Sequence, residues 1–452
     1  MNNILLFGDL VIDEKISGIY TKIAPSGQFP VVNIKNKSKN IGCCGNVLFN
    51  ILEFFDNIYF ITCINSNEIS EVEELISNYK NIKLINFHQT NRHIIRKHRI
   101  YCNNTCISRF DEETIYNIDN INETKIITYI ESIISNINIA LLSDYNKGTL
   151  TKNLTLKILE LTNKYNIISL IDPKSCDFSK YKNATIVKPN TIEFQECLKY
   201  EKIDTYNDID MIKDKIIDKY NIKIILNTLA DKGMRIFFKN NDNILTFIDE
   251  PVVKSNIIDV IGCGDTIIAA LSIYISENKY KLNNNYYRHM LNILCKNGKK
   301  AVETSGCYIL NKYDWKQCYK NPSVVFTNGC FDILHIGHIK LLKECKKLGS
   351  KLIIGINSDE SIKRIKGNDR PINNLQDRIN FLSELNIADE IISFEDDTPI
   401  KLIKQIRPNI LVKGDDYKKE DIVGSEYVEN VIILNFYKNY STTNIINTIL
   451  TK

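Results

Sequence analysis

Apolar runs alternate with stretches of helical periodicity along the first half of the chain, and this alternation predicts its fold. Six apolar runs are predicted as buried strands, at residues 4–12, 57–64, 139–145, 167–173, 184–190 and 222–228. Segments with helical periodicity lie between them, at 45–55, 150–164 and 207–219. This order favours an α/β fold with a doubly wound, mostly parallel sheet that binds ligands at the carboxyl ends of its strands. Residues 15–37 and 90–110 fit less well and predict short β segments outside the sheet, placed as a lid over a substrate.

A second alternating series begins after Asn321-Pro322. Its strands are predicted at 323–329, 351–358, 390–394, 409–414 and 430–436, with helices near 338–348, 374–386 and 398–406. The series predicts a compact Rossmann-like domain of about 130 residues, a size that folds alone. We expect the boundary within 311–322, after the single Trp315, which gives domains over residues 1–315 and 322–452.

Composition narrows the class of protein. The net charge of +4 comes from 58 basic and 54 acidic residues spread along the chain, so neither a nucleic-acid nor a membrane partner is expected. No apolar run approaches the length of a membrane span, and the first residues lack the basic region of a signal peptide. The 13 cysteines include no C-x-x-C pair, which is typical of a protein of the reducing cytoplasm without a disulfide framework or zinc site.

The segment DVIGCGDTIIAA (259–270) carries the sharpest chemistry of the first half. A Gly-Cys-Gly turn runs into an apolar helix and places Asp265 in its first turn. The backbone N–H groups of Gly262, Cys263 and Gly264 are predicted to form an anion hole for a transferring phosphoryl group. Asp265 would accept the proton of the attacking sugar hydroxyl. The alternative is an ordinary aspartate at the start of a buried helix.

Further fragments recur in a fixed order. Gly8-Asp9 with Asp13 follows the first strand, GCCGN (42–46) opens a helix, and KPNTIEF (188–194) follows a later strand. In this order the set resembles the ribokinase-like (PfkB) sugar kinase family over residues 1–310. The resemblance implies ATP as phosphoryl donor, magnesium held with ATP and not in a protein cage, and a homodimer formed through the lid. It also implies sugar-binding residues (Asp9, Asp13, Gly42, Asn46 and Arg109) and residues for ATP and magnesium (Asn190, Glu193, Thr228 and Gly233).

Two longer segments narrow the resemblance. LLSDYNKGTL (141–150) and residues 171–190 resemble the kinase half of bacterial heptose 7-phosphate kinases. Such a sugar already carries a phosphate and needs a cationic pocket. Candidates by location only are Lys97, Arg99, Arg109 and Lys174, although each is explained more readily as an ordinary surface charge.

The chain departs from the family pattern at Cys43, Ala230, Ile261 and Cys263. A thiol at a helix N-terminus tends to have a lowered pKa, so Cys263 is predicted to be reactive and protected by ATP. The alternative is an inert buried thiol.

The segment VFTNGCFDILHIGH (325–338) dominates the second half. His335 and His338 follow a strand and a glycine-bearing loop and precede a helix expected to begin near Ile339. The start of a helix attracts anions, and two imidazoles there could hold a polyphosphate and neutralise its charge. The alternative is a pair of capping or surface histidines. The pattern resembles the HxGH signature of nucleotidyltransferases, which implies nucleotide contacts from Thr327, Gly329, Phe331, Lys363, Lys366, Arg370, Lys413, Ser441 and Thr442. Arg378 and Thr443 belong to the same cationic and hydroxyl-rich segments, and Asp415 stands where a glycine is usual.

Together the two halves resemble the bifunctional heptose kinase–adenylyltransferases. The resemblance implies an enzyme that phosphorylates D-glycero-β-D-manno-heptose 7-phosphate at C1 and later transfers adenylate from ATP to heptose 1-phosphate. The product would be ADP-heptose for lipopolysaccharide core. Two alternatives stay open, a sugar or polyol kinase fused to a cytidylyltransferase and a non-catalytic kinase-like sensor or scaffold beside an active transferase.

Overall fold

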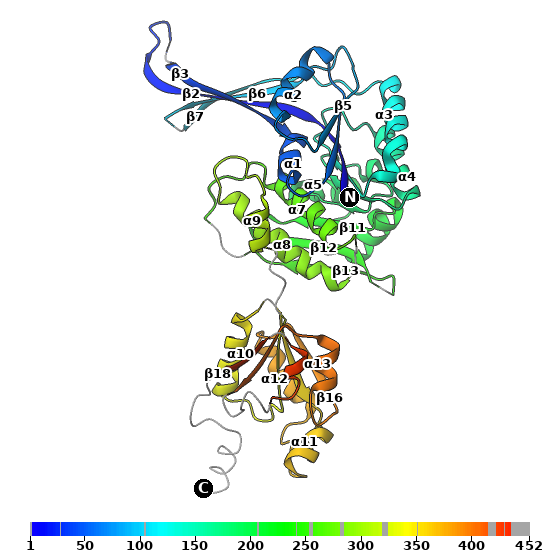
Figure 1. Ribbon diagram of the computed structural model, residues 1–452, viewed down its shortest axis with the longest axis vertical. Coiled ribbons are helices and arrows are strands. Elements are labelled where there is room, and N and C mark those ends of the chain that lie inside the picture. The colour runs from blue at the N-terminus through cyan, green and yellow to red at the C-terminus, as the bar shows by residue number, and fades with distance from the viewer. Residues whose placement is uncertain are drawn as a thin grey trace. The chain divides into compact units, whose positions relative to one another are not determined.

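The chain divides into two compact units, Met1–Tyr319 and Lys320–Lys452, each built on its own sheet (Figure 1). The computed structural model describes residues 2–27, 29–103, 105–205, 208–240, 242–252, 256–280, 284–318, 324–349, 351–414, 422–428 and 430–434. Several predicted features lie outside these residues, namely the Asn321-Pro322 boundary, Asp415, Ser441, Thr442 and Thr443.

The first unit contains a nine-stranded sheet that includes all six predicted strands. Its order is β13-β12-β11-β10-β9-β8-β1-β4-β5, and only the pairings of β12 with β11 and β13 are antiparallel. The strands are β1 (Asn3–Gly8), β4 (Asn57–Thr62), β5 (Ile82–Asn86), β8 (Ile139–Ser143), β9 (Ile168–Asp172), β10 (Ile186–Val187), β11 (Ile224–Thr228), β12 (Met234–Lys239) and β13 (Leu245–Glu250). The prediction of a doubly wound, mostly parallel sheet is confirmed, while β5, β12 and β13 were not predicted.

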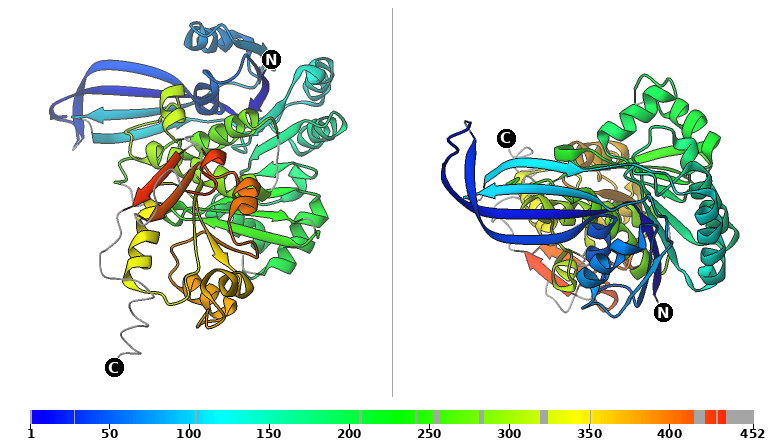
Figure 2. Two further views of the ribbon diagram at one scale, coloured as in Figure 1. Left: turned by 60° about the horizontal axis from the view of Figure 1, so that its bottom comes forward. Right: turned by 90° about the horizontal axis from the view of Figure 1, so that it is seen from above.

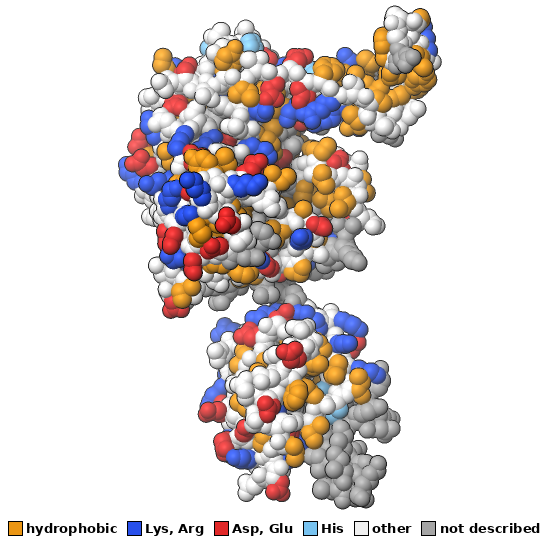
Figure 3. All heavy atoms as spheres, turned by 180° about the vertical axis from the view of Figure 1, so that it is seen from behind, with side chains coloured by type: hydrophobic (Ala, Val, Ile, Leu, Met, Phe, Trp, Pro, Cys, Tyr) orange, Lys and Arg blue, Asp and Glu red, His pale blue; other side chains and the backbone are white. Residues whose placement is uncertain are grey.

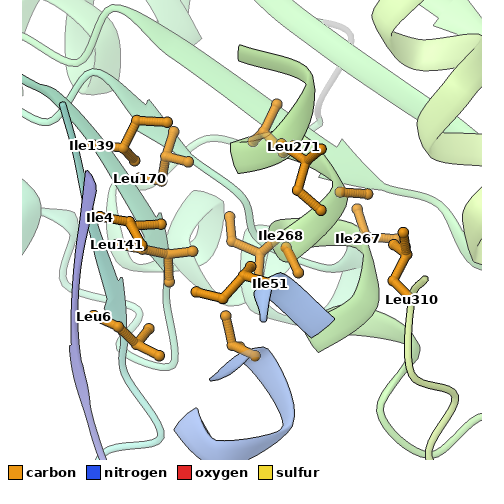
Figure 4. Packing of buried hydrophobic residues seen from close by; sticks show 14 of the residues in the cluster. Ile4, Leu6, Ile51, Ile139, Leu141, Leu170, Ile267, Ile268, Leu271 and Leu310 are labelled. Atoms are coloured by element: carbon orange, nitrogen blue, oxygen red, sulfur yellow. The ribbon is translucent and has the colours of Figure 1, made fainter. Parts of the chain in front are cut away.

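Helices cover both faces of this sheet because successive residues of each strand point to opposite sides. Ile4 and Leu6 pack on one side with α1 and α7, as Figure 4 shows, whereas Leu5 and Phe7 pack on the other. The first side carries α1 (Cys44–Ile51), α2 (Ile69–Ile76), α7 (Cys263–Glu277), α8 (Asn284–Val302) and α9 (Lys312–Cys318). The second carries α3 (Asn120–Ile133), α4 (Lys152–Lys164), α5 (Thr191–Tyr200) and α6 (Ile209–Ile212), the last continued by a π-helical turn over Lys213–Asp218.

The lid is a separate four-stranded sheet that extends from the body of the first unit (Figures 1 and 2). Its order is β3-β2-β6-β7, formed by β2 (Leu10–Ile23), β3 (Pro30–Cys43), β6 (Ile95–Cys102) and β7 (Thr105–Glu112). The expectation of short segments was wrong for β2 and β3, which run for 14 residues each. The two strands pair with each other, so their backbone N–H and C=O groups are satisfied over this length. Their strongly polar sequence does not show the hydrophobic pattern from which a long strand would be predicted.

The second unit is a five-stranded parallel sheet with order β16-β15-β14-β17-β18. All five predicted strands are confirmed, as β14 (Val324–Gly329), β15 (Lys351–Asn357), β16 (Glu390–Phe394), β17 (Ile410–Gly414) and β18 (Asn430–Leu434). The helices are α10 (Ile336–Lys347), α11 (Asp359–Lys366), α12 (Leu375–Glu384) and α13 (Ile400–Ile406). Helix α10 begins three residues before the expected Ile339, so His338 lies in its first turn.

Arg378 of α12 is fully buried and acts inside the second unit, so the sequence-based grouping with phosphate-binding cations was wrong. Its guanidinium donates to the carbonyl oxygens of Cys330, Asn357 and Asn373 and to a carboxylate oxygen of Asp359. These acceptors belong to separate loops at the carboxyl end of the sheet. Arg378 therefore fixes the loops that surround the HxGH segment.

We predict that Arg378→Met lowers the free energy of unfolding of the second unit by about 3 kcal/mol or more, because it leaves buried acceptors without a donor. The matched control is Arg364→Met, which breaks an exposed ion pair with Asp397 and should cost less than about 1 kcal/mol. Calorimetric unfolding of the full chain measures both. Equal losses in the two variants would contradict the assigned role.

Candidate active sites

The candidate base of the kinase, Asp265, lies in the first turn of α7 and is almost fully buried. Gly262 precedes the helix with a φ of 74°, a left-handed conformation that favours glycine. One carboxylate oxygen of Asp265 accepts a hydrogen bond from the Tyr145 hydroxyl (2.7 Å), and the other accepts from the Asn46 amide (3.0 Å). Asn46 and Asp265, which the sequence analysis names for separate roles, therefore lie in one site, and Tyr145 joins them.

Burial and the nearby charge of Asp172 raise the pKa of Asp265 to about 7. The hydrogen bonds from Tyr145 and Asn46 and the charge of Lys188 act in the opposite direction. A carboxyl group with this pKa changes protonation near neutral pH, which suits a general base.

A buried ion pair lies beside this carboxylate and was not singled out from the sequence. Lys188 Nζ is 2.9 Å from Asp172 Oδ1, and it lies 3.7 Å from the position that a Cβ on Gly264 would take. Burial tends to lower the pKa of Lys188, but the charges of Asp172, Glu193 and Asp265 outweigh burial and raise it. The ammonium group therefore stays charged at the start of α7. Asp172 is the last residue of β9, and Lys188 directly follows β10. Their positions at the carboxyl edge of the parallel sheet could have identified them as site residues from the sequence.

The loop before α7 differs in part from the predicted anion hole. The Cys263 N–H donates to the Val260 carbonyl oxygen at 3.4 Å, and the thiol contacts the Gly298 carbonyl oxygen at 3.8 Å. Burial raises the pKa of Cys263. The expectation of a lowered thiol pKa was therefore wrong, because desolvation outweighs the favourable position at the helix start.

Asp9, predicted as a sugar ligand, has internal partners in this structure. Its carboxylate accepts hydrogen bonds from the backbone N–H groups of Tyr145, Lys147 and Thr149, at 2.8, 3.0 and 3.0 Å. These bonds fold the loop after β8 and bring the Tyr145 hydroxyl to Asp265. Direct contact of Asp9 with sugar stays a prediction.

The other predicted sugar residues lie where the lid joins the body. Asp13 Oδ1 accepts from Arg99 Nη1 at 2.6 Å. A Cβ on Gly42 would lie 2.1 Å from Asp13 Oδ2, so only glycine leaves room for this carboxylate. Arg109 is further out on β7 and makes a two-point hydrogen bond with Asp111.

A cleft of about 1060 Å³ opens beside Lys188 and Gly264. Its lining includes the four residues predicted for ATP and magnesium, Asn190, Glu193, Thr228 and Gly233. Ala230 also lines it with a φ of 52°, which explains why a glycine suits this position. Residues from four separate strand ends thus meet in one cleft large enough for a nucleotide.

The cleft contains carboxylates that could bind magnesium. Asp172 and Glu193 both line it, and carboxylate oxygens are the ligands that magnesium prefers. The described residues contain no group of three or more His, Cys, Asp or Glu side chains arranged to hold a metal ion. The two carboxylates fit a magnesium ion in their chemistry, and magnesium held with ATP stays a prediction. Lys174, a candidate for the sugar phosphate, instead pairs with Glu193 on this nucleotide side.

The HxGH segment of the second unit brings its two histidines into direct contact. Their rings stack with centroids 3.9 Å apart, and His335 immediately precedes α10. Burial lowers the pKa of both, and for His338 the value falls to about 4 with a further contribution from His335. Without a bound anion both rings are therefore neutral and serve as hydrogen-bonding groups, while their role toward a polyphosphate stays a prediction. The buried Nδ1 of His338 has no hydrogen-bond partner among the described residues, which fits a site that receives a ligand.

The remaining transferase predictions divide into two groups. Thr327 and Gly329 lie at the carboxyl end of β14, where Lys413 Nζ contacts Asn328 Oδ1 at 2.7 Å. Phe331 packs its ring edge against His338, and Arg370 pairs with the buried Asp332. Of these residues, Phe331 is in contact with a histidine of the segment. By contrast, Lys363 pairs with Glu360 on the exposed side of α11, while the charge of Lys366 acts at Cys330.

Comparison with known proteins agrees with both units. Residues 20–308 match the pfkB family carbohydrate kinases, and residues 326–448 match the cytidylyltransferase-like family. The chain is 35% identical to the bifunctional protein HldE of Campylobacter fetus and 34% identical to that of Aliarcobacter butzleri. These alignments cover 99% of this chain in both cases and 100% and 97% of the relatives.

The chain belongs to the HldE family. The prediction of a bifunctional enzyme with a carbohydrate kinase and a nucleotidyltransferase is thereby confirmed. The match extends over nearly the full length of the HldE proteins. It therefore favours the bifunctional kinase and nucleotidyltransferase over a kinase fused to a cytidylyltransferase and over a non-catalytic scaffold.

Solved structures support the fold of the kinase unit alone. Phosphofructokinase-2 from Escherichia coli aligns with a TM-score of 0.56 at 14% identity, covering 70% of this chain and 97% of that one. Ribokinase from Thermotoga maritima aligns with a TM-score of 0.52 at 16% identity, covering 71% and 100%. The expected ribokinase-like fold is confirmed.

We predict that the kinase activity falls as the pH drops through about 7, where Asp265 takes up a proton. Tyr145→Phe removes a donor that favours the ionised carboxylate, so the pKa of Asp265 should rise and this acidic limb should move up by about one pH unit. A pH profile of kcat/KM measures the shift. Tyr59→Phe, which loses only a contact with Lys83, serves as control. A uniform loss at every pH would indicate a merely structural role.

A second prediction concerns His338. An imidazole that is neutral at pH 7 acts by hydrogen bonding, and His338→Ala should lower adenylyl transfer by about a hundredfold or more. Kinase activity of the same preparation is the internal control. Titration of the His338 ring by NMR without nucleotide should show a midpoint near 4; a midpoint above 6 would contradict the neutral assignment.

Proposed function

We propose that the chain supplies ADP-activated heptose for lipopolysaccharide core in the cytoplasm, using ATP and magnesium in both of its units. The kinase domain would comprise residues 1–315 and the transferase domain residues 322–452. Among the described residues no helix is long and apolar enough to cross a bilayer. The observation that carries the proposal is a buried carboxylate of raised pKa, Asp265, at the meeting point of a sugar-side lid and a nucleotide-sized cleft.

In the kinase step, Asp265 accepts the proton of the C1 hydroxyl of D-glycero-β-D-manno-heptose 7-phosphate as its oxygen attacks the γ-phosphorus of ATP. ADP leaves, and the product is heptose 1,7-bisphosphate. Lys188 and the start of α7 stabilise the charge of the transferring group. A magnesium ion bound with ATP would be held near Asp172 and Glu193 and would reduce the charge of the phosphates. Asp13, Gly42, Asn46 and Arg109 are proposed to bind the sugar.

In the transferase step, a phosphate oxygen of heptose 1-phosphate attacks the α-phosphorus of ATP, and pyrophosphate leaves. This step needs removal of the 7-phosphate by a separate phosphatase. The protein's task is to position the reactants and stabilise charge, since no covalent enzyme intermediate is required. His335, His338, Thr327, Gly329, Lys413 and Arg370 are proposed to hold the nucleotide, with Phe331 supporting His338. Ser441, Thr442, Lys363 and Lys366 are proposed to close over the phosphates.

The decisive experiment supplies the purified chain with heptose 7-phosphate and ATP, and separately with heptose 1-phosphate and ATP. Asp265→Asn should abolish the first reaction and leave the second, whereas His338→Ala should do the reverse. Because each variant is the control of the other, general misfolding would be recognised at once. The proposal fails if the wild-type chain consumes ATP with neither sugar. Replacing ATP by CTP in the second reaction tests the nucleotide, and faster turnover with CTP would reject the adenylyl assignment.

The proposed homodimer is tested by sedimentation of the full chain. The outer part of the lid exposes large hydrophobic side chains, Ile19, Tyr20, Ile23, Phe29 and Ile34. Such a surface on a long hairpin suits burial against a second copy. A monomer at micromolar concentration would contradict this part of the proposal.

A further inference from the structure

Cys43 joins the lid to α1 in a backbone conformation that residues with a side chain rarely adopt. It is the last residue of β3 and directly precedes α1, with a φ of 53° and a ψ of −119°. These angles are those of the first central residue of a type II′ turn, where glycine dominates. Cysteine carries a Cβ into this region, so the backbone is strained there.

Contacts on both sides of Cys43 impose this conformation. Cys43 pairs with Leu10 between the lid strands β3 and β2. The next residue, Cys44, is fully buried, and its N–H donates to the carbonyl oxygen of Asp9 at 3.0 Å. The strained angles are those that join this strand pairing directly to this helix start, so relaxation at Cys43 would disturb one or the other.

The side chain of Cys43 packs beneath Tyr145. Cys43 is 5% exposed and clusters with Val11 of β2 and Ile95 of β6, and Tyr145 packs against this cluster. The N–H of Tyr145 is held by the carboxylate of Asp9. That bond fixes only the main chain, since a side chain still rotates about its first torsion angle. The direction of the Tyr145 ring therefore depends on packing against the cluster.

The Cys43 thiol also lies close to the partner of Tyr145, the carboxylate of Asp265. Burial raises the pKa of the thiol well above its usual range, and the charge of Lys97 offsets part of this rise. The charge of Asp265 raises the pKa further, as it does only at short range. The thiol therefore stays uncharged and packs as a small apolar group beside the hydrogen bond between Tyr145 and Asp265.

We infer that Cys43 is a positioning residue of the kinase, whose side chain holds the Tyr145 ring so that its hydroxyl stays on the carboxylate of Asp265. The inference rests on the proposed function, in which Asp265 is the base. Glycine at residue 43 would relax the backbone but leave the ring unsupported, so the strain accompanies a contact that only a side chain can make. Because Val11 and Ile95 belong to lid strands, the same contact ties Tyr145 to the lid.

Two substitutions separate the strain from the contact. Cys43→Ala keeps the Cβ and its strain, whereas Cys43→Gly removes both. Glycine ordinarily destabilises a fold relative to alanine, but Cys43→Gly should unfold about 1–3 °C above Cys43→Ala in calorimetry of the full chain. The matched control is Cys197, which is buried in the helix α5, and there the glycine variant should unfold below the alanine variant. The same order at Cys43 as at Cys197 would overturn the strain.

Kinetics test the positioning role. Both Cys43 variants should lower kcat with heptose 7-phosphate by about three- to tenfold, a part of the effect of losing a charged hydrogen bond, and leave KM for this sugar within about twofold. In the Tyr145→Phe background the same substitutions should lower kcat by less than about twofold, because the hydroxyl that they misplace is absent. Cys197→Ala should leave kcat unchanged. A raised KM at constant kcat, or equal losses with and without the Tyr145 hydroxyl, would overturn the inference.

Unfolding measurements separate this inference from the proposed function. If Cys43 supports the Tyr145 hydroxyl, the double variant Cys43→Ala, Tyr145→Phe should lose less in unfolding temperature than the sum of the two single losses. Failure of the wild-type chain to phosphorylate the sugar would reject the proposed function. In that case non-additive losses would still uphold the contact, and additive losses would reject it as well. An active wild-type kinase with additive effects on kcat and on unfolding would overturn this inference alone.

Discussion

The kinase unit depends on a single buried carboxylate, that of Asp9. The chain leaves the main sheet at Gly8, the end of β1, and enters the lid at Leu10, the start of β2. Asp9 alone forms this connection. Its carboxylate holds three backbone N–H groups of the loop after β8, and its carbonyl oxygen accepts from the N–H of Cys44 at the start of α1. Lid, sheet, α1 and the Tyr145 loop therefore meet at one group. Loss of these bonds would leave several buried donors unsatisfied at once.

In each unit, burial favours the uncharged form of a candidate catalytic side chain. Desolvation raises the pKa of Asp265 and lowers that of His338, and both changes disfavour the charged form. Permanent positive charge is supplied separately, by Lys188 in the first unit and by Lys413 in the second. In the proposed function, Asp265 exchanges a proton and His338 donates or accepts a hydrogen bond, while the two lysines would contact the phosphates.

Periodicity in the sequence was sufficient for the elements that bury a continuous apolar face. All eleven predicted strands correspond to strands in the structure, and Asp265 starts its helix as expected. Strands at the edge of the sheet, such as β5, were missed because their exposed positions break the pattern. The long polar strands of the lid were underestimated for the same reason, since their pairing partners are distant in sequence.

The parts of the sites that could not be predicted depend on contacts between distant residues. Tyr145 reaches Asp265 across 120 positions, through a loop whose backbone N–H groups donate to the carboxylate of Asp9. The position of Cys263 at the start of a helix could not show whether its thiol pKa is raised or lowered. The pKa is raised by burial, and burial depends on the packing of Gly298 and its neighbours. Likewise, Arg378 stands in one segment with the cations predicted to bind phosphate, and the sequence does not distinguish it from them. Its burial and its four acceptors within the second unit show its structural role.

The absence of space at Gly42 bears on how the acceptor range of this enzyme could change. Residue 42 presents only main chain to Asp13, and even a methyl group there would collide with the carboxylate. Main chain cannot be trimmed or enlarged by exchanging one amino acid for another. If the lid contacts the acceptor as proposed, divergence toward a new acceptor would proceed through the side chains of the lid strands, which can be replaced one at a time.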